Sequence, residues 1–399
     1  MNVSALPAGW RWSTLGEIAP ADRKLANGVD GGLPYLGLED IEAGTGRILQ
    51  SSDAGDGAGA FKFDQRHVLY GKLRPYLNKV ALPDFVGRCT MEAIPLLCGE
   101  GIERRYVAAF LRRPETVAAA MRENTGSRMP RADMKVISGL RVPVPPIAEQ
   151  RRIADQLDAA MGEVSAASGM ISRQQADCER LYFAAIEEAM GGRAIATEDV
   201  EDWDDGSWVA LTRVAQLESG HTPSRRHPEW WGGAVSWIAL PDIRGLDGKT
   251  ALETAETTNA MGLANSSARL LPEGTVVLSR TASVGFVTVM GREMATSQDF
   301  VNWVPGPRLR AWYLAYALIG ARDYLRKLAS GAVHKTIYMP TLKALHLRLP
   351  TLVEQERIIE RIRQGHAALA DSSQAIAAQT AALGAIPATL LGAAFRGDL

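Results

Sequence analysis

The stretch "VPVPPIAEQRRI" at residues 142–153 is written again, in diverged form, as "LRLPTLVEQERI" at residues 347–358. Each version has proline, then Glu-Gln, then a basic and apolar run, and paired positions differ by one constant number (354 − 149 = 205 for the two glutamates). Proline presets φ for a first helical turn, and an acidic residue suits the positive end of the helix dipole. The string therefore predicts a helix start, written twice; a role in subunit docking is the alternative.

The repeat extends over the whole chain. Upstream at the same offset, "TGSRMPRADMKVISGLRVPVP" from residue 125 aligns with "SGAVHKTIYMPTLKALHLRLP" from residue 330. The beginnings match with a slightly smaller offset, since "WSTLGEIA" at Trp12 resembles "WVALTRVA" at Trp208 and Asp40 pairs with Asp242. The chain consists of two diverged copies of one unit.

Each copy changes character at its Glu-Gln string. Before the string, short strand-like runs alternate with Gly, Asn and Asp turns around a helical stretch, which is typical of an α+β domain. After it, apolar residues recur alternately four and three positions apart, which predicts a coiled-coil seam. The seam residues are Ile153, Leu157, Ala160, Val164, Ala167, Ile171, Gln174, Cys178, Leu181 and Ala185 in the first copy, and Ile358, Ile362, Gly365, Leu369, Ser372, Ile376, Gln379, Leu383, Ile386 and Leu390 in the second.

The predicted fold class is α+β. Two tandem α/β domains are separated and joined by two long helices, which form an antiparallel coiled coil with a pseudo-twofold internal repeat. Each helix would span roughly 60 Å at 1.5 Å per residue, and Pro387 predicts a kink or break in the second. The expected boundaries are 1–146 for the first domain, 147–192 for the central helix, 193–207 for an acidic linker, 208–351 for the second domain and 352–399 for the C-terminal helix.

Composition describes an ordinary soluble protein. The 399 residues carry a net charge of −1, with 46% hydrophobic and 22% charged residues, enough for more than one core. The scattered Cys89, Cys98 and Cys178 form no disulfide framework or zinc site, which favours a reducing compartment. The sequence shows no secretory pattern, and we expect no run to reach the length of a membrane span. We expect a cytoplasmic protein with no membrane partner.

No catalytic constellation stands out. "GLDGKT" (residues 245–250) ends like a phosphate loop, but Ile243 occupies the place of the first glycine. "PDIRGLDGK" (residues 241–249) imitates a metal-nuclease string, yet its carboxylates are too close in sequence to come from two strands. The chain has no Asn/Asp-Pro-Pro-aromatic string of an adenine methyltransferase, and its six histidines lack metal-ligand spacing. We expect no enzyme activity, no metal and no cofactor.

Cations gather with turn residues in loops of both copies. Lys and Arg neutralise phosphates, Arg and Asn read base edges, and loops can diverge to read different sequences. The adjacent Trp230 and Trp231 fit either a core or a base-stacking role. The predicted DNA-binding residues are Lys72, Arg74, Asn78, Lys79, Arg128 and Arg131 in the first copy, and Arg225, Arg226, Arg280, Thr281, Ser283, His334 and Lys335 in the second.

Over essentially its full length the chain resembles the specificity subunit of type I restriction–modification systems. The two proline–Glu-Gln helix starts match, as does the ending "AAFRGDL", which "AMGG" at Ala189 echoes weakly. The resemblance implies a non-catalytic subunit whose two target recognition domains each read half of a bipartite site in double-stranded DNA.

The resemblance also implies partners. The helices would set the spacing between half-sites and dock adenine methyltransferase (modification) subunits, and a restriction subunit (an ATP-dependent nuclease and translocase) would be a further partner. Because target domains diverge widely, no base-contacting residue is carried over. The alternative is a stand-alone coiled-coil adaptor that binds DNA or protein without a restriction partner.

Overall fold

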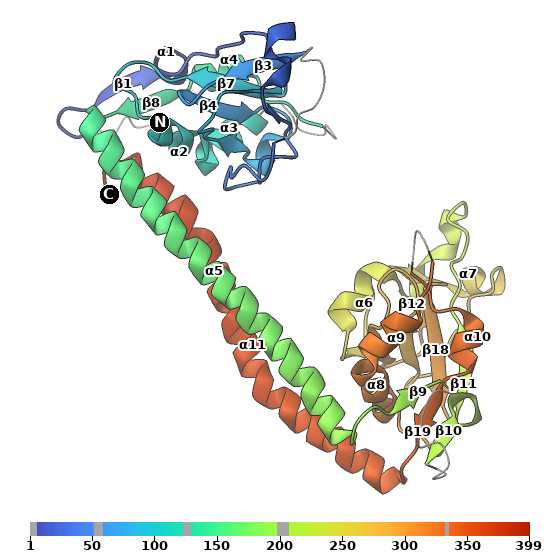
Figure 1. The fold of residues 1–399 in the computed structure, drawn as a ribbon. Coiled ribbons are helices and arrows are strands. Elements are labelled where there is room, and N and C mark those ends of the chain that lie inside the picture. Colours follow the sequence, from blue (N-terminus) through green and yellow to red (C-terminus); the bar gives the residue numbers. More distant parts are fainter. Residues whose placement is uncertain (1–5, 52–58, 123–128, 198–206, 332–334) are drawn as a thin grey trace. The chain divides into compact units, whose positions relative to one another are not determined.

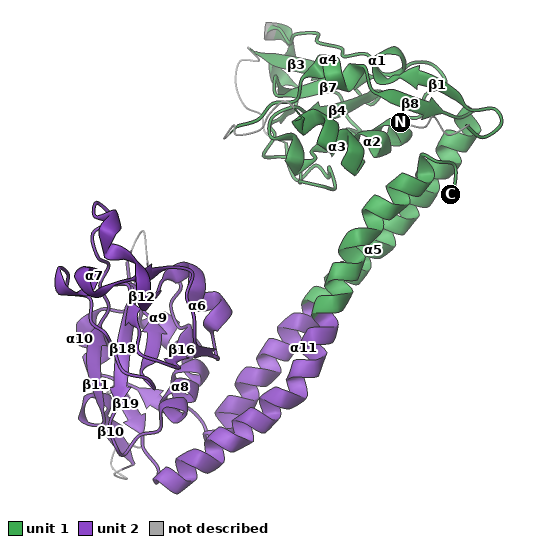
Figure 2. Ribbon diagram, turned by 180° about the vertical axis from the view of Figure 1, so that it is seen from behind, with its two compact units in different colours: residues 1–172, 377–399 green, residues 173–376 purple. Residues whose placement is uncertain are grey.

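The computed structural model describes residues 6–51, 59–122, 129–197, 207–331 and 335–399. It divides into two compact units, Met1–Ser172 with Ala377–Leu399 and Arg173–Ile376 (Figure 2). The division cuts across the two long helices, α5 (Ile147–Ala189) and α11 (Leu352–Ala394), so each unit joins one globular domain to two helix halves.

The first globular domain is built from short strands with helices packed on them. Strands β1 and β8 pair antiparallel, and two three-stranded sheets run in the orders β2-β6-β3 and β5-β4-β7. The elements are β1 (Arg11–Thr14), α1 (Leu15–Ile18), β2 (Tyr35–Leu36), β3 (Ala60–Phe63), β4 (His67–Gly71), β5 (Val80–Ala81), β6 (Gly87–Thr90), β7 (Ala93–Leu97), α2 (Arg104–Leu111), α3 (Pro114–Met121), α4 (Met134–Ser138) and β8 (Arg141–Val144).

The second globular domain has a five-stranded sheet, β11-β18-β15-β16-β13, and two three-stranded sheets, β10-β19-β9 and β14-β12-β17. The strands are β9 (Ile195–Ala196), β10 (Trp208–Ala210), β11 (Ala215–Ser219), β12 (Trp231–Ile238), β13 (Thr250–Ala251), β14 (Thr257–Thr258), β15 (Val276–Ser279), β16 (Val287–Met290), β17 (Ala295–Thr296), β18 (Phe300–Pro305) and β19 (His346–Arg348). The helices are α6 (Leu240–Leu246), α7 (Ala260–Ala264), α8 (Ala311–Gly320), α9 (Arg322–Leu328) and α10 (Met339–Lys343).

Equivalent segments of the two copies have equivalent neighbours. The order β5-β4-β7 in the first domain corresponds to β16-β15-β18 in the second, and the β1–β8 pair corresponds to β10–β19. Helices α2 and α8, most of whose residues are buried, follow the third strand of each set. The α+β class and the internal repeat are confirmed.

The two long helices lie antiparallel in both units. In the first, Leu157 near the start of α5 shares a hydrophobic core with Leu391 near the end of α11. In the second, Ile186 near the end of α5 shares a core with Ile362 near the start of α11. Figure 1 shows the two helices side by side, and the antiparallel pairing is confirmed.

The polar members of the predicted seam, Gln174, Ser372 and Gln379, are exposed. Among the apolar members, the seam fails at one equivalent position in each helix. Leu181 is 58% exposed and Ile386 is 36% exposed, whereas Ile186 and Leu391 are buried. A straight α-helix drifts from a strict 3.5-residue repeat, and the end of each helix turns its buried face toward a globular domain. These two seam assignments were therefore wrong.

Pro387 does not interrupt α11, so the expected break is absent. Proline removes the hydrogen bond to the carbonyl four residues earlier, and the surrounding residues 384–386 are exposed, where water can take the place of that bond. Thr389 also donates its hydroxyl to the carbonyl of Ala385, at 3.2 Å.

By length and composition α11 contains a segment apolar enough to cross a membrane. An 18-residue window has a mean hydropathy of 1.4, so the expectation that no run reaches such a length was wrong. The sequence analysis missed this segment because α11 is rich in alanine, which raises its mean hydropathy without forming a run of large apolar residues. Only 17% of the window is buried, and α11 packs against α5 in both units.

Phe395, immediately beyond α11, completes the core of the first domain. Its ring lies 4.7 Å from that of Tyr106 and 5.4 Å from that of Phe110, and the Arg113 guanidinium lies over it, 5.2 Å from its centre. We expect Phe395→Ala to lower the free energy of unfolding of this unit by about 3–5 kcal/mol. The exposed Ile386→Ala should cost less than about 1 kcal/mol. Denaturant titration of both variants measures the difference; equal losses would contradict this packing.

Candidate nucleic-acid interface

In the first domain the loop after β4 is tied to a segment far along the chain. The backbone N–H of Arg74 donates to the Pro130 carbonyl at 2.7 Å, and that of Ala132 donates to the Lys72 carbonyl at 2.8 Å. Leu73 and Arg131 form the β-bridge between them. The fold therefore brings together the two loops in which the sequence predicted DNA contacts.

The second domain repeats this arrangement after β15. The N–H of Ala282 donates to the Lys335 carbonyl at 3.2 Å, and that of Ile337 donates to the Arg280 carbonyl at 2.9 Å. Thr281 and Thr336 form the corresponding bridge. Each domain thus carries a paired-loop surface: residues 72–79 with 129–132 in the first, and residues 280–283 with 335–337 in the second.

Both paired-loop surfaces hold non-glycine residues in the left-handed backbone region. Arg74 has φ 51° and Ala282 has φ 60°, and Asn78 (φ 49°) completes the set of positive-φ non-glycine residues in the described part of the chain. This conformation costs an L-residue roughly 1–2 kcal/mol, and such strain clusters at functional sites. No pattern in the sequence signals it, since neither Arg nor Ala favours this region.

Several predicted residues hold the loops in shape. In the first domain, Arg131 pairs with Glu92 at 3.1 Å, and Lys72 lies 3.9 Å from the same carboxylate. The Asn78 amide donates to the Arg112 carbonyl, and the Lys79 ammonium donates to the Leu38 carbonyl.

Arg280 and Thr281 play the same part in the second domain. Arg280 is half-buried and donates to the Gln298 carbonyl at 3.1 Å, and Thr281 accepts a hydrogen bond from the Thr336 hydroxyl. The predicted residues Arg128 and His334 lie outside the described residues.

The exposed cations are the side chains that could reach a ligand. Arg74 is exposed at the tip of the first paired-loop surface, and Lys335 is exposed on the second. A depression of about 300 Å³ beside the second surface is lined by Ser283 and Lys335 together with Arg244 and Arg326. Sequence reasoning missed these two arginines because they lie on α6 and α9, outside the loops.

The segment before β12 is largely occupied by its own contacts. Arg225 forms two hydrogen bonds with Glu256, at 2.9 and 2.5 Å, and its guanidinium lies 3.7 Å from the centre of the Trp231 ring. The hydrogen bond from Arg225 lowers the pKa of Glu256, so the pair stays ionic at neutral pH. Arg226 is exposed.

The tryptophan pair packs within the domain. Trp231 meets the buried Trp237 edge-on at 4.8 Å, and Trp230 stacks on His227 at 4.1 Å. Gln298 links this region to the second paired-loop surface, because it accepts a hydrogen bond from Thr222 and its carbonyl accepts one from Arg280.

The carboxylates of the nuclease-like string have structural partners. Asp242 accepts backbone hydrogen bonds from Ala239 and Ala255, which fixes the start of α6. Asp247 forms a half-buried ion pair with Arg322 at 2.7 Å.

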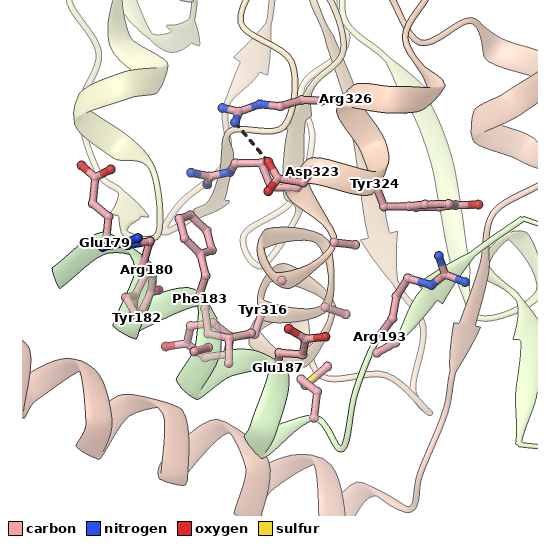
Figure 3. A pocket seen from close by; sticks show the side chains of 18 of the residues that line it. Glu179, Arg180, Tyr182, Phe183, Glu187, Arg193, Tyr316, Asp323, Tyr324 and Arg326 are labelled. Atoms are coloured by element: carbon pink, nitrogen blue, oxygen red, sulfur yellow. Dashed lines mark hydrogen bonds and ion pairs between the residues drawn. The ribbon is translucent and has the colours of Figure 1, made fainter. Parts of the chain in front are cut away.

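A cavity of about 800 Å³ lies in the second unit, where the end of α5 meets α8 and α9 (Figure 3). Aromatic rings of Tyr182, Phe183 and Tyr316 line it. Each of its arginines already has a partner: carboxylates for Arg180, Arg322 and Arg326, and aromatic rings for Arg193 and Arg244. Among the described residues, the cavity is a crevice at a packed joint and presents no unpaired arginine to a ligand.

Together these features define a class of protein: two related domains that present equivalent loop surfaces and are joined by paired helices. Residues 201–377 match the model of a family described as the type I restriction modification DNA specificity domain. Over this segment, which is fewer than half of its 399 residues, the chain is similar to type I restriction–modification specificity subunits. Members of this family are the non-catalytic, DNA-recognising components of their systems.

Curated relatives include three specificity subunits of type I restriction enzymes. That of MjaIX from Methanocaldococcus jannaschii is 26% identical over 160 residues, and that of EcoDI from Escherichia coli is 23% identical over 225. These matches cover 40% and 54% of this chain but only 36% and 50% of the relatives' own length. That of StySPI from Salmonella potsdam is 21% identical, covering 100% of this chain and 91% of the relative.

Solved structures share the fold. A chain from a study of complex assembly and conformational transition of the type I R-M system has a TM-score of 0.78 at 23% identity, covering 99% of this chain and 100% of that one. The HsdS subunit from Thermoanaerobacter tengcongensis has a TM-score of 0.52 at 23% identity, covering 100% and 99%.

Proposed function

We propose that this chain recognises a bipartite site in double-stranded DNA, with each globular domain reading one half-site through its paired-loop surface. The observation that carries the proposal is the duplication of these surfaces. Both copies join two distant loops, strain a non-glycine residue at the equivalent place, and present an exposed cation. Cations fix a protein on the phosphates, and neighbouring loop side chains read the bases.

The two long helices are proposed to dock adenine methyltransferase subunits. Their pairing leaves large apolar side chains in water: Leu181, Ile386, Met170 and Val353 are 36–61% exposed. The apolar window of α11 is only 17% buried. Exposed apolar surface of this kind marks interaction sites. A restriction subunit with ATP-dependent nuclease and translocase activity is the further proposed partner, and the cytoplasm is the proposed location.

Co-expression with the partner methyltransferase tests the proposal. The purified complex should methylate adenine in DNA that carries both half-sites, and S-adenosylmethionine should be the methyl donor. DNA with one half-site scrambled should remain unmethylated. A chain that binds no methyltransferase and shows no sequence preference in DNA binding would instead support the adaptor alternative.

We expect the isolated chain to transfer no methyl group and cleave no DNA. The carboxylates of its nuclease-like string are engaged in helix capping and an ion pair. Incubating the chain alone with DNA, S-adenosylmethionine and Mg²⁺ checks this. Adenine methylation by this polypeptide alone would contradict the expectation.

The exposed cations of the paired-loop surfaces should contact phosphates. Arg74→Ala and Lys335→Ala should each reduce the slope of log K against log salt by roughly 0.9 for each phosphate that the substitution leaves without its cation. Arg213→Ala is the matched control, because Arg213 is exposed in the short turn directly after β10 and lies outside both paired-loop surfaces. Titration of the complex with labelled DNA at several salt concentrations measures the slopes. If the slopes of both loop variants equal that of the wild type, the DNA phosphates do not contact Arg74 or Lys335.

A further inference from the structure

The glutamine of the repeated Glu-Gln string is buried at the base of each long helix. Gln150 is 1% exposed, and its side-chain amide makes three hydrogen bonds. The amide nitrogen donates to the carbonyls of Pro145, at 2.8 Å, and Gly101, at 3.2 Å. The amide oxygen accepts from the backbone N–H of Glu103, at 2.9 Å. One side chain on α5 thus holds the residue leaving β8 and the turn that begins α2.

Gln355 repeats these contacts in the second unit. It is fully buried, and its amide nitrogen donates to the carbonyls of Pro350 and Arg308, both at 3.0 Å. Its amide oxygen accepts from the backbone N–H of Arg310, at 2.9 Å. The residues contacted are the sequence equivalents of those around Gln150. Two copies that differ at most positions have kept one hydrogen-bonding pattern.

Further contacts surround each glutamine. The hydroxyl of Tyr106 on α2 donates to the Pro143 carbonyl at 2.6 Å, and that of Tyr313 on α8 donates to the Arg348 carbonyl at 2.7 Å. Ion pairs link the same elements to the long helices. Arg105 pairs with Asp155 and Asp158 on α5, and Arg310 pairs with Glu356 on α11.

We infer that Gln150 and Gln355 are positioning residues that set the angle between each globular domain and its long helix. The inference rests on the proposed function, in which each domain must meet its half-site at a defined place. Apolar contacts tolerate small rotations, whereas an amide with three buried backbone partners has one geometry in which all three bonds form. Rotation of the domain about the helix start would break those bonds in a buried place, where no water replaces them.

Spin-label distances within one unit test the angle directly. Labels at Val86→Cys on the first domain and Ser168→Cys on α5 are both exposed, in a chain with Cys98 and Cys178 replaced by Ala. Gln150→Met keeps the shape of the side chain and removes its hydrogen bonds, and it should widen the distance distribution about twofold. In the second unit, spin labels at Leu252→Cys on the second domain and Asp371→Cys on α11 measure the effect of Gln355→Met in the same way.

The matched controls are Gln156→Met and Gln364→Met, exposed glutamines on the same two helices. Their distributions should stay narrow. If a methionine variant fails to fold, Gln150→Glu or Gln355→Glu keeps the acceptor and loses two donors, and should also widen the distribution. The Gln150 and Gln355 variants could instead fold, melt at a lower temperature and keep the wild-type distance distributions. That result would show that the two glutamines only stabilise the fold, and it would overturn the inference.

The preference for one spacer length between the two half-sites tests the inference through function. Bipartite DNA substrates are compared at the preferred spacer length and at one base pair more and less. The preference is the ratio of methylation at the preferred spacer to methylation at the other two lengths. In the double variant Gln150→Met, Gln355→Met this ratio should fall about tenfold, comparable to the discrimination carried by one base pair. If the wild-type complex methylates no bipartite substrate, the proposed function fails while the distance measurements still decide the role of the glutamines. A double variant with the wild-type preference would count against the positioning role.

Discussion

A fragment of residues 193–399 should form an antiparallel homodimer that recognises an inverted repeat of the second half-site. The fragment contains the second domain and α11 but lacks α5, whose end contributes to the core of that domain. The end of α11 carries equivalent residues: Leu391 stands where Ile186 does, and Phe395 where Met190 does (391 − 186 = 205). A second fragment can therefore supply the missing contacts in both directions, as in a closed isologous pair.

Sedimentation and light scattering of the soluble fragment measure its association. The variant Leu369→Asp with Ile376→Asp is the control, because it places charges in the seam, where Ile376 is 5% exposed. It should remain a monomer or lose solubility. A well-folded monomeric fragment would contradict the symmetry argument. With a methyltransferase partner, the fragment dimer should methylate the palindrome and leave the parental bipartite site untouched.

Lengthening both long helices should change the spacer and leave the half-sites unaltered. Four residues inserted after Ser172 and after Ile376 fall where the two compact units divide, in antiparallel partners. They add about 6 Å to each helix, which corresponds to about two base pairs of DNA. We therefore expect the preferred spacer to lengthen by one to two base pairs, with methylation at the original spacer falling at least about tenfold.

Insertion into one helix alone is the matched control. It makes one helix longer than the other, so the seam between them loses its register beyond the insertion. DNA binding should therefore weaken at every spacer length. Methylation of a library of spacer lengths distinguishes these outcomes. A double insertion that docks its partners yet keeps the original spacer would show that the helices do not set the distance.

The internal repeat made most of the fold predictable. A constant offset between "VPVPPIAEQRRI" and "LRLPTLVEQERI" indicated two domains and two helices, and the heptads indicated their pairing. The positions that escaped prediction are those where local pattern and tertiary packing disagree. Leu181 and Ile386 continue the heptad, but the globular domains redirect the buried face of each helix. Pro387 lies on an exposed turn, so its missing bond is tolerated.

The candidate site was predictable as loops and not as individual contacts. Cation-rich turns pointed to residues 72–79 and 280–283, and the fold joins each to its partner loop. Whether a cation remains exposed depends on neighbours that the fold brings to it, such as Glu92. A short stretch of sequence does not reveal these neighbours. The buried role of Gln150 was missed because its string was interpreted as a helix start, with subunit docking as the alternative. Its signal was the exact repetition of an amide beside prolines in both copies.

The place of Phe395 has a consequence for biosynthesis. The first domain emerges first from the ribosome, yet its core needs Leu391, Ala394 and Phe395, made more than half of the chain later. At 5–20 residues per second, this delay is roughly 10–50 s. During this time Tyr106 and Phe110 lack their aromatic neighbour, leaving an apolar surface for chaperones to cover. Synthesis that stops inside α11 would leave a chain with an unfinished first domain, a target for quality control before assembly.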